Sequence, residues 1–388
     1  MSTPQTPAPE DSWRALSTTS LLQLIEQADI TGMGGGGFPT AQKLTVALEW
    51  QAANAAETIR FIANGVACEP GIDADLWIME RAAEDVLLGA LIVARILATD
   101  VLTLALGPRL QHLAEPLQTL WQTLATPQSP TLLIHESDSS PAAGAERLLI
   151  EAVTGVRADP QSAPAAQGFI VQNVTTLWAI GRVVVTGEPA SRRPVTVGTE
   201  TQWLALGSRI ADLPEAAGCN RDGGHWSSVP LAADAVVRGS TLALHQQDPQ
   251  SPMPCIGCGE CAAICPVAID PEALHRIGTT LPQRSPTVSD TQSYNSPVLQ
   301  LQRAGIDDCV ECGACNVSCP SHIDLVADFR RSKRVSQQAS AALAQAARAS
   351  ARYERHEQRL ANRAAAAASK RSARLQRTRS WEDAGDTT

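Results

Sequence analysis

Four cysteines lie close together in Cys255-Ile256-Gly257-Cys258-Gly259-Glu260-Cys261-Ala262-Ala263-Ile264-Cys265-Pro266, at the spacing CxxCxxCxxxCP. The same spacing and the same final proline recur over residues 309–320. Ten cysteines are few for a disulfide scaffold of this length, whereas closely spaced thiols are typical of metal binding because thiolates are soft ligands. The two runs hold eight of the ten cysteines, so the sequence predicts metal centres here.

Both runs resemble the signature of bacterial two-cluster ferredoxins. In that family three closely spaced cysteines bind one [4Fe–4S] cluster, and the fourth cysteine of the run binds the other cluster. Structural zinc also uses CxxC pairs, but zinc explains neither the third cysteine at the same spacing nor the repeated Cys-Pro ending. The resemblance implies one cluster on Cys255, Cys258, Cys261 and Cys319, and another on Cys265, Cys309, Cys312 and Cys315. We interpret Cys68 and Cys219 as bystanders, since single cysteines are mostly small buried hydrophobic residues.

The charge of the chain is divided unevenly. The 388 residues include 31 Lys and Arg and 40 Asp and Glu, for a net charge of −9. From Arg330 onward there are fourteen basic and five acidic residues, so the tail carries +9 and the rest of the chain −18. An acidic body argues against a nucleic-acid-binding core and makes the tail the candidate for electrostatic contacts.

Targeting and membrane signals are weak in this sequence. Residues 1–11 have no basic segment followed by an apolar one, as a signal peptide requires. The longest apolar stretch, Val86 to Ala98, contains Arg95 and is shorter than the ~20 residues that span a bilayer. We therefore expect a protein of a reducing compartment that has no membrane anchor of its own.

Helix-like and strand-like segments alternate over the first half of the chain. Apolar runs such as Val101 to Leu106 are typical of strands in a covered parallel sheet. The pattern predicts helices over 16–28, 41–56, 76–98, 110–124 and 145–154, and strands over 58–63, 101–106 and 131–135. This alternation predicts a three-layer α/β domain.

Composition divides the chain into five segments. Short apolar segments such as Val195 to Val197, separated by Gly and Pro, predict a small β-rich module after the α/β domain. The Ala/Arg-rich tail has high helix propensity and no sustained apolar stripe, so we expect a solvated helix or disorder. The predicted segments are a disordered N-terminus (1–15), the α/β domain (16–190), the β-rich module (191–246), the two-cluster domain (247–330) and the tail (331–388).

A glycine-rich loop runs from Gly32 to Thr40 and contains GxGxxG. A Rossmann dinucleotide site requires a strand before this motif and an acidic residue at the end of the next strand. Here the preceding residues are helix-like, and the next predicted strand is followed by Asn64. As a Rossmann fingerprint the match is weak.

The same loop, with Lys43, resembles GxGGxGFPTxxK, which is shared by the NADH-oxidising flavoprotein of respiratory complex I and the RnfC component of the Rnf electron-transport complex. Three further segments resemble motifs of this family in the same order: Asn64 to Gly71 followed by Asp75 and Met79, Gly144 to Glu151, and Gln172 to Thr176. A flavin domain, a small SLBB-like β module and a ferredoxin-like α-helical two-cluster domain follow one another in RnfC. The cobalamin reductase of bacterial microcompartments has the same order.

The resemblance implies that the α/β domain binds FMN and NADH. Backbone amides of a glycine run can approach a phosphate closely, and Lys43 can neutralise it. Asn64 and Asn173 match positions that contact the flavin. Phe38, Glu69 and Glu146 match positions on the nicotinamide side. The implied cofactor-binding residues are Gly32, Gly34, Gly35, Gly37, Phe38, Lys43, Asn64, Glu69, Glu146 and Asn173, and no residue is predicted to be catalytic.

Some positions depart from the family pattern, and these departures keep alternatives open. Ala67 and Ala145 replace an acidic residue and a glycine, Ser140-Pro141 replaces Tyr-Pro, and a GGPM-type segment is absent around residues 223–226. The sequence also starts close to the glycine loop, without the N-terminal barrel-like domain of typical RnfC, which favours the cobalamin reductase. A non-enzymatic dicluster relay without flavin or NADH would explain Ala67 and Ala145.

The leading hypothesis is an RnfC-like electron-transfer protein that moves electrons between NADH, FMN and two [4Fe–4S] clusters. We expect it on the cytoplasmic side of the inner membrane, held by other subunits of a membrane electron-transport complex, with a ferredoxin or a quinone-side acceptor as a further partner and no nucleic acid. In the tail, five basic residues lie three to four positions apart: Arg348, Arg352, Arg355, Arg359 and Arg363. We expect them to contact an acidic protein surface or anionic lipid. The alternative is that the tail is a solvated helix.

Overall fold

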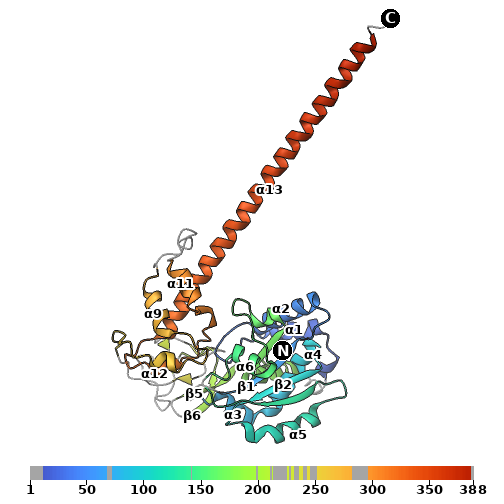
Figure 1. Ribbon diagram of the computed structural model, residues 1–388. Helices are drawn as coiled ribbons and strands as arrows, with labels where there is room; N and C mark the ends of the chain where they lie inside the picture. Colours follow the sequence, from blue (N-terminus) through green and yellow to red (C-terminus); the bar gives the residue numbers. More distant parts are fainter. Residues whose placement is uncertain are drawn as a thin grey trace. The chain divides into compact units, whose positions relative to one another are not determined.

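A computed structural model shows how these segments fold (Figure 1). It describes residues 12–67, 72–140, 142–197, 200–209, 212, 225–226, 229–230, 236–238, 243–244, 251–281 and 296–385. The chain divides into two compact units, Met1–His275 with Gly305–Arg330, and Arg276–Ala304 with Arg331–Thr388. The first unit contains both the α/β domain and the two cysteine runs.

The centre of the first unit is a four-stranded parallel sheet in the order β3-β2-β1-β4. The strands are β1 (Arg60–Gly65), β2 (Val101–Leu106), β3 (Thr131–Glu136) and β4 (Phe169–Asn173). Asn64 pairs in register with Asn173 across β1 and β4. Because all the strands are parallel, their carboxyl ends meet at one edge of the sheet, which is where ligands bind in open α/β sheets.

Alternate side chains of the central strand face two separate apolar cores. Phe61 and Ala63 belong to the larger core, and Ile62 belongs to the smaller one. Six helices supply side chains to the larger core: α1 (Thr18–Gln27), α2 (Thr40–Ala53), α3 (Ala74–Arg81), α4 (Ala83–Leu97), α5 (Ala114–Leu124) and α7 (Val174–Thr186). Helix α6 (Glu146–Thr154) covers the other face through Leu149 and Ile150. The predicted three-layer α/β architecture is confirmed.

Helices α4 and α7 cross with their backbones in direct contact. A Cβ atom on Gly89 would lie 1.9 Å from the carbonyl oxygen of Leu177, and one on Gly181 would lie 2.1 Å from that of Asp85. Real Cβ atoms do not approach this closely, so both positions require glycine. Ten of the thirteen residues of α7 are buried, which removes the polar face that would reveal this helix in the sequence.

The predicted helix over 76–98 consists of two helices. Ala82 has non-helical backbone angles (φ −143°, ψ 35°) and separates α3 from α4. The break lets Ile78 of α3 and Val86 of α4 both reach the larger core. The predicted strand over 101–106 has the same bounds as β2. Because the apolar run is nearly continuous, its first and last residues mark the ends of the strand.

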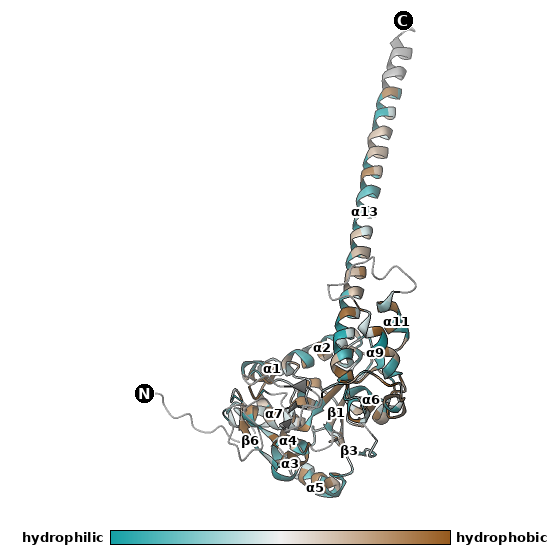
Figure 2. Cartoon of the chain, turned by 90° about the vertical axis from the view of Figure 1, so that its left-hand side faces the viewer, coloured by the Kyte–Doolittle hydropathy of each residue, from teal (hydrophilic) through white to brown (hydrophobic). Residues whose placement is uncertain are grey.

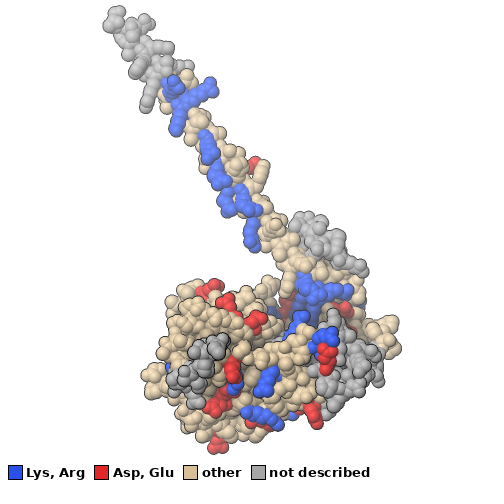
Figure 3. Space-filling model, turned by 180° about the vertical axis from the view of Figure 1, so that it is seen from behind, with Lys and Arg blue, Asp and Glu red and all other residues tan. Residues whose placement is uncertain are grey.

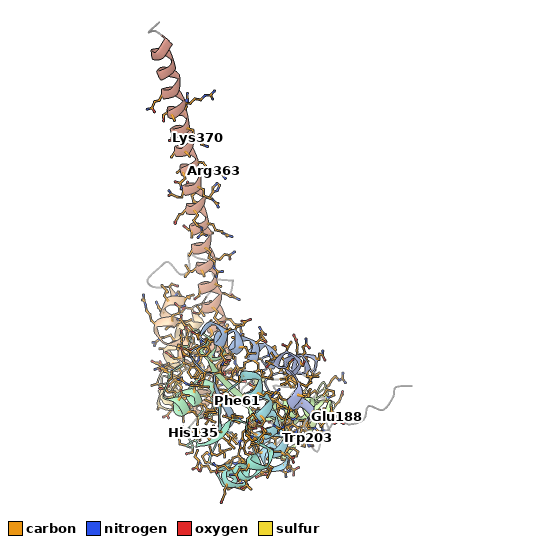
Figure 4. All side chains as sticks on the ribbon, turned by 90° about the vertical axis from the view of Figure 1, so that its right-hand side faces the viewer. Phe61, His135, Glu188, Trp203, Arg363 and Lys370 are labelled. Atoms are coloured by element: carbon orange, nitrogen blue, oxygen red, sulfur yellow. The ribbon has the colours of Figure 1, made fainter. Side chains whose placement is uncertain are left out.

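The β-rich module packs against the α/β domain. Strand β5 (Arg192–Val197) pairs antiparallel with β6 (Glu200–Ala205) and parallel with β9 (Ala243–Leu244), and β7 (His225–Trp226) pairs with β8 (Val229–Pro230). Trp203 of β6, labelled in Figure 4, lies 5.1 Å from the Trp77 ring and 4.8 Å from the Trp178 ring. The module is therefore anchored on α3 and α7, next to the edge of the sheet.

Short helices carry part of each cysteine run. Helix α8 (Glu260–Ala263) holds the third cysteine of the first run, and α12 (Ala314–Ser318) holds the third cysteine of the second. Gly259 and Gly313 precede these helices with nearly equal left-handed φ angles of 77° and 78°. The two runs thus repeat in conformation as well as in spacing, because glycine adopts this backbone region without strain.

The C-terminal residues form one long helix, α13 (Leu325–Gly385), and α9 (Pro271–Thr279) and α11 (Pro297–Arg303) precede it. Colouring by hydropathy shows no continuous apolar stripe along α13 (Figure 2), and its Lys and Arg side chains form a blue row in Figure 3. Arg363 and Lys370 belong to this row and are exposed. None of the helices in the described ranges is long and apolar enough to cross a bilayer.

Candidate cofactor sites

The glycine loop connects α1 to α2 and is closed by its own backbone. The amide of Gly32 donates to the carbonyl of Phe38 (2.8 Å), and the amide of Gly37 donates to the carbonyl of Gly32 (3.1 Å). Gly35 and Gly37 have left-handed φ angles of 94° and 62°. A helix precedes this loop, whereas a Rossmann site requires a strand at that point.

Polar contacts hold the loop against the carboxyl edge of the sheet. The amide of Met33 donates to Thr176 Oγ1 of α7 (2.8 Å), and a guanidinium nitrogen of Arg193 donates to the carbonyl of Met33 (3.0 Å). A Cβ atom on Gly34 would lie 2.9 Å from the Cβ of Asn173. Gly34 therefore lets the loop backbone lie directly on Asn173, closer than any other residue would allow.

Asn173 links the loop to a buried carboxylate. Its Oδ1 accepts from the amide of Thr175 and caps α7 (2.9 Å), while its Nδ2 donates to Asp75 (2.7 Å). The Thr175 hydroxyl also donates to Asp75 (2.8 Å). Burial raises the pKa of Asp75 above its ordinary value of 3.8, and the bonds from Thr175 and Asn173 and the charge of Arg193 oppose this rise. Burial likewise lowers the pKa of Arg193 to about 10, so this side chain still carries its charge at neutral pH.

Lys43 and Glu146 meet at the same edge. Lys43 Nζ donates to Glu146 Oε1 (2.7 Å) and to the carbonyl of Val171 (2.7 Å). Asn64 Nδ2 donates to the carbonyl of Gly144 (2.8 Å), so both ends of the 144–146 segment are held. Four segments that resembled one family's motifs therefore converge here, and we name this group of residues the sheet-edge site: Gly34, Lys43, Asn64, Glu146 and Asn173.

Two further predicted side chains, Glu69 and Phe38, are not included in the sheet-edge site. Glu69, with its neighbour Cys68, lies outside the described residues, and so does Cys219. Phe38 is 49% exposed at the end of the glycine loop. The exposed ring is compatible with a position on the ligand side of the loop, which is where the resemblance places it.

The sheet-edge site has the features that a polar, phosphate-bearing cofactor needs. Among the described residues, two nearby buried groups have no hydrogen-bond partner, the Thr40 hydroxyl and the Gln172 amide nitrogen. A Cβ atom on Gly36 would meet nothing within 4 Å, so space is open beside the loop. Buried polar groups are normally satisfied, and a bound ligand would supply the missing partners. Sequence reasoning did not single out Thr40 and Gln172, although both lie inside the quoted motifs.

The cysteine runs line two hollows in the same unit. Cys265, Cys309, Cys312 and Cys315 line one, which we name the inner hollow because Cys309 and Cys315 are buried. Cys255, Cys258, Cys261 and Cys319 line the other, the outer hollow, in which Cys255 and Cys258 are exposed. The fourth cysteine of each run thus lies with the first three of the other run. In the described ranges, no three His, Cys, Asp or Glu side chains lie close enough together to ligate a single metal ion.

Local bonds produce this crossing of the two runs. The amide of Met253 donates to the carbonyl of Ser321 (2.9 Å), and the Ser321 hydroxyl donates to the carbonyl of Pro254 (3.0 Å). The chain entering the first run is therefore tied to the chain leaving the second. Burial raises the pKa of the Cys315 thiol to about 12, and the neighbouring thiols add to the rise. A metal that binds there must displace the proton, as is general for thiolate ligands.

Comparison with known proteins identifies two known domains in the chain. Residues 25–182 match the family described as the Nuo51 FMN-binding domain, and residues 251–323 match the 4Fe-4S dicluster domain. The RnfC component of the ion-translocating oxidoreductase complex of Vibrio cholerae serotype O1 is 31% identical over 289 residues, covering 69% of this chain and 35% of that protein. The chain is a homologue of RnfC. The predicted FMN-binding domain and two-cluster domain are thereby confirmed.

Two more relatives show how much of RnfC is represented. The RnfC protein of Pseudomonas aeruginosa is 32% identical over 292 residues, 69% of this chain and 36% of that protein. That of Buchnera aphidicola is 23% identical over 354 residues, 84% of this chain and 68% of that protein. The chain spans about a third of the length of the Vibrio and Pseudomonas RnfC proteins.

Solved structures show the same fold. A chain of an NAD+-reducing [NiFe]-hydrogenase in the H2-reduced state superposes with a TM-score of 0.53 at 21% identity. The match covers 85% of this RnfC homologue and 65% of the hydrogenase chain. At this identity the likeness concerns the architecture alone.

Proposed function

We propose that this RnfC homologue moves electrons between NADH, a bound FMN and two [4Fe–4S] clusters, as one subunit of a membrane-associated redox complex. FMN can take two electrons as a hydride and release them singly, which is the exchange between nicotinamide and iron–sulfur chemistry that such a subunit needs. The observation that carries the proposal is the convergence of the sheet-edge site within the compact unit that also holds two four-thiol hollows.

The sheet-edge residues would hold the cofactor by position and charge. Lys43 is fixed by Glu146 and Val171, and these contacts use two of its three N–H donors. The remaining donor suits a phosphate oxygen. The network through Asn173, Asp75 and Arg193 holds the glycine loop in place, so that its amides are arranged before a ligand arrives.

The eight cysteines of the two hollows are the proposed cluster ligands. The outer cluster would be held by Cys255, Cys258, Cys261 and Cys319, and the inner cluster by Cys265, Cys309, Cys312 and Cys315. A [4Fe–4S] cluster needs four thiolates, and each hollow supplies four. The proposed domain limits are those predicted from the sequence. The α/β domain covers residues 16–190, and the two-cluster domain covers residues 247–330.

The relatives' name supports a proposal about partner subunits. The relatives are named as one subunit of an ion-translocating oxidoreductase complex, and we propose partner subunits for this chain too, on the cytoplasmic side of the inner membrane. A ferredoxin or a quinone-side carrier would be the further redox partner. The basic row on α13 offers one electrostatic contact for a partner subunit or anionic lipid.

The decisive experiment is anaerobic reconstitution of the chain with iron, sulfide and FMN. We expect about eight irons per chain, one flavin released on denaturation, and bleaching of flavin and cluster absorbance on addition of NADH. Eight irons without flavin and without a response to NADH would leave only the dicluster relay. Zinc in place of iron would contradict both. NADH-dependent reduction of a cobalamin, with no transfer to a ferredoxin, would favour the cobalamin-reductase alternative.

A further inference from the structure

One arginine bridges the α/β domain and the second cysteine run. Arg147, in the first turn of α6, donates to the carbonyl of Asp307 at 2.7 Å and also to the carbonyl of Pro160. Asp307 belongs to η6 (Ile306–Asp308), which directly precedes Cys309. The first turn of α6 is therefore bonded to the chain that enters the inner hollow.

The same turn of α6 forms one side of the sheet-edge site. Glu146 directly precedes Arg147 and accepts from Lys43 at 2.7 Å. The cap residue of the helix, Ala145, forms no side-chain capping bond, so this end of α6 lacks a common local source of stability. Tertiary contacts such as those of Arg147 therefore hold the turn that presents Glu146 to Lys43.

The other end of this bridge depends on the inner hollow. Cys309 and Cys315 are 8% and 9% exposed and lie in a space lined by four thiols. A metal cluster bound by all four thiolates fixes the chain around it, because the free energy of metal binding is also free energy of folding. Metal binding therefore orders the run that starts at Cys309 and, with it, the carbonyl of Asp307.

From these contacts we infer that iron loading of the inner hollow strengthens FMN binding at the sheet-edge site, and that Arg147 transmits the effect. With the cluster in place, the Asp307 carbonyl is fixed and holds Arg147. The first turn of α6 then presents Glu146 to Lys43, and Lys43 is positioned for the phosphate of FMN. The inference rests on the proposed function, because it takes FMN at the sheet-edge site and a cluster in the inner hollow as given. It adds a dependence of one binding site on the other, and Arg147 is its positioning residue.

A second arginine joins the same two regions and provides a matched control. Arg157 pairs with Asp308 at 3.0 Å, but the Arg157 side chain is 67% exposed. Exposed ion pairs contribute little, because water and salt screen them. Arg157 lies beyond the C-terminal end of α6, whereas Arg147 is adjacent to Glu146. Loss of the Arg157 pair should therefore leave the sheet-edge site in place.

The affinity for FMN in the metal-free and the iron-loaded protein is the direct test. The full chain is prepared without metal, and half of it is reconstituted anaerobically with iron and sulfide. Equilibrium dialysis gives the dissociation constant of FMN for each form without interference from cluster absorbance. We expect iron loading to lower this constant at least about fivefold, the lower end of the typical range for two interacting sites. Equal constants in the two forms would overturn the inference.

Ligand variants show which hollow is responsible. Cys312→Ala changes the second cysteine of the inner hollow, and Cys258→Ala changes the second cysteine of the outer hollow. Each variant should take up about four irons in place of about eight. Iron loading should still strengthen FMN binding at least about fivefold in Cys258→Ala, and less than about twofold in Cys312→Ala. An equal effect of iron in the two variants would contradict the role of the inner hollow.

A variant that keeps all eight cysteines separates transmission from a structural role. In Arg147→Gln, the metal-free form should bind FMN as the original metal-free protein does, and iron loading should no longer strengthen binding. Arg147→Lys, which can still donate to the Asp307 carbonyl, should recover part of the effect, and Arg157→Gln should retain all of it. Equal weakening of FMN binding in both forms of Arg147→Gln would show a merely structural role and contradict the inference.

Failure of this inference and failure of the proposed function give different results. If neither the metal-free nor the iron-loaded protein binds FMN, the proposed function fails. If both forms bind FMN with the same affinity, the proposed function stands, and only the dependence of the flavin site on the inner hollow is overturned.

Discussion

The sheet-edge site and the cysteine hollows hold their cofactors by different means. At the sheet edge, protein groups hold one another in place: Lys43 bonds to Glu146, and Asn173 bonds to Asp75. In the hollows, four thiols line each space, and burial and the neighbouring thiols raise the pKa of Cys315 to about 12, which favours the protonated thiol. The proposed flavin site is therefore built by folding, whereas we expect the cluster region to be completed by its metal.

Removal of iron should produce the largest effect and the sharpest contrast. We expect chelation of iron under denaturant-free conditions to unfold residues 251–330 while the α/β domain stays folded, because metal binding supplies on the order of 10 kcal/mol in small metal domains. Hydrogen exchange would show lost protection in the cluster region and retained protection in β1 and β2. Equal protection with and without iron would mean that the hollows, too, are built by folding alone.

Arg193 tests how far the sheet-edge network depends on one buried charge. Arg193→Met leaves the Asp75 carboxylate without its opposing charge, and loss of one partner of a buried pair costs about 3–5 kcal/mol. Urea unfolding should show this loss in the α/β domain, accompanied by weaker FMN binding. Arg193→Lys keeps the charge and should recover part of both. If Arg193→Met unfolds at the same urea concentration as the original protein, the buried charge adds nothing to the free energy of unfolding.

The glycine loop offers a matched pair of substitutions. In Gly34→Ala the new Cβ would lie 2.9 Å from Asn173, and in Gly36→Ala it would meet nothing within 4 Å. We expect FMN affinity to fall at least about tenfold, or 1.4 kcal/mol, in the first variant and to change little in the second. Fluorescence titration of the apoprotein with FMN measures both. Equal losses would place the flavin over the open side of the loop at Gly36.

The buried carboxylate gives a smaller, pH-dependent effect. Because the folded pKa of Asp75 lies above its ordinary value of 3.8, the folded state binds the proton more tightly than the unfolded chain does. The contribution of this group to stability should therefore increase as pH falls through the folded pKa toward 3.8. Urea unfolding across this window should show the effect in the original chain and not in Asp75→Asn. The opposite slope would mean that Asp75 is stabilised as a carboxylate.

Much of the cluster region could be read from local sequence. The CxxCxxCxxxCP spacing identifies the dicluster domain, because three ligands of each cluster lie within seven residues. The strand over 101–106 was equally clear, because its apolar run is continuous. The helix over 76–98 was wrong as a single element, since only packing against the larger core explains the turn at Ala82. Helix α7 was not predicted, and ten of its thirteen residues are buried.

The sequence by itself predicted the domain order, the two cysteine runs and the motif residues of the proposed flavin site, since these predictions depend on short-range spacing. Only the tertiary structure brought Asn173 onto Gly34, joined Asp75 to the loop through Asn173, and placed Arg193 of the β module beneath Met33. It also separated two runs of equal spacing into an inner and an outer hollow. The physical reason is that burial and long-range hydrogen bonds depend on residues far apart in the chain, whose contact no local pattern records.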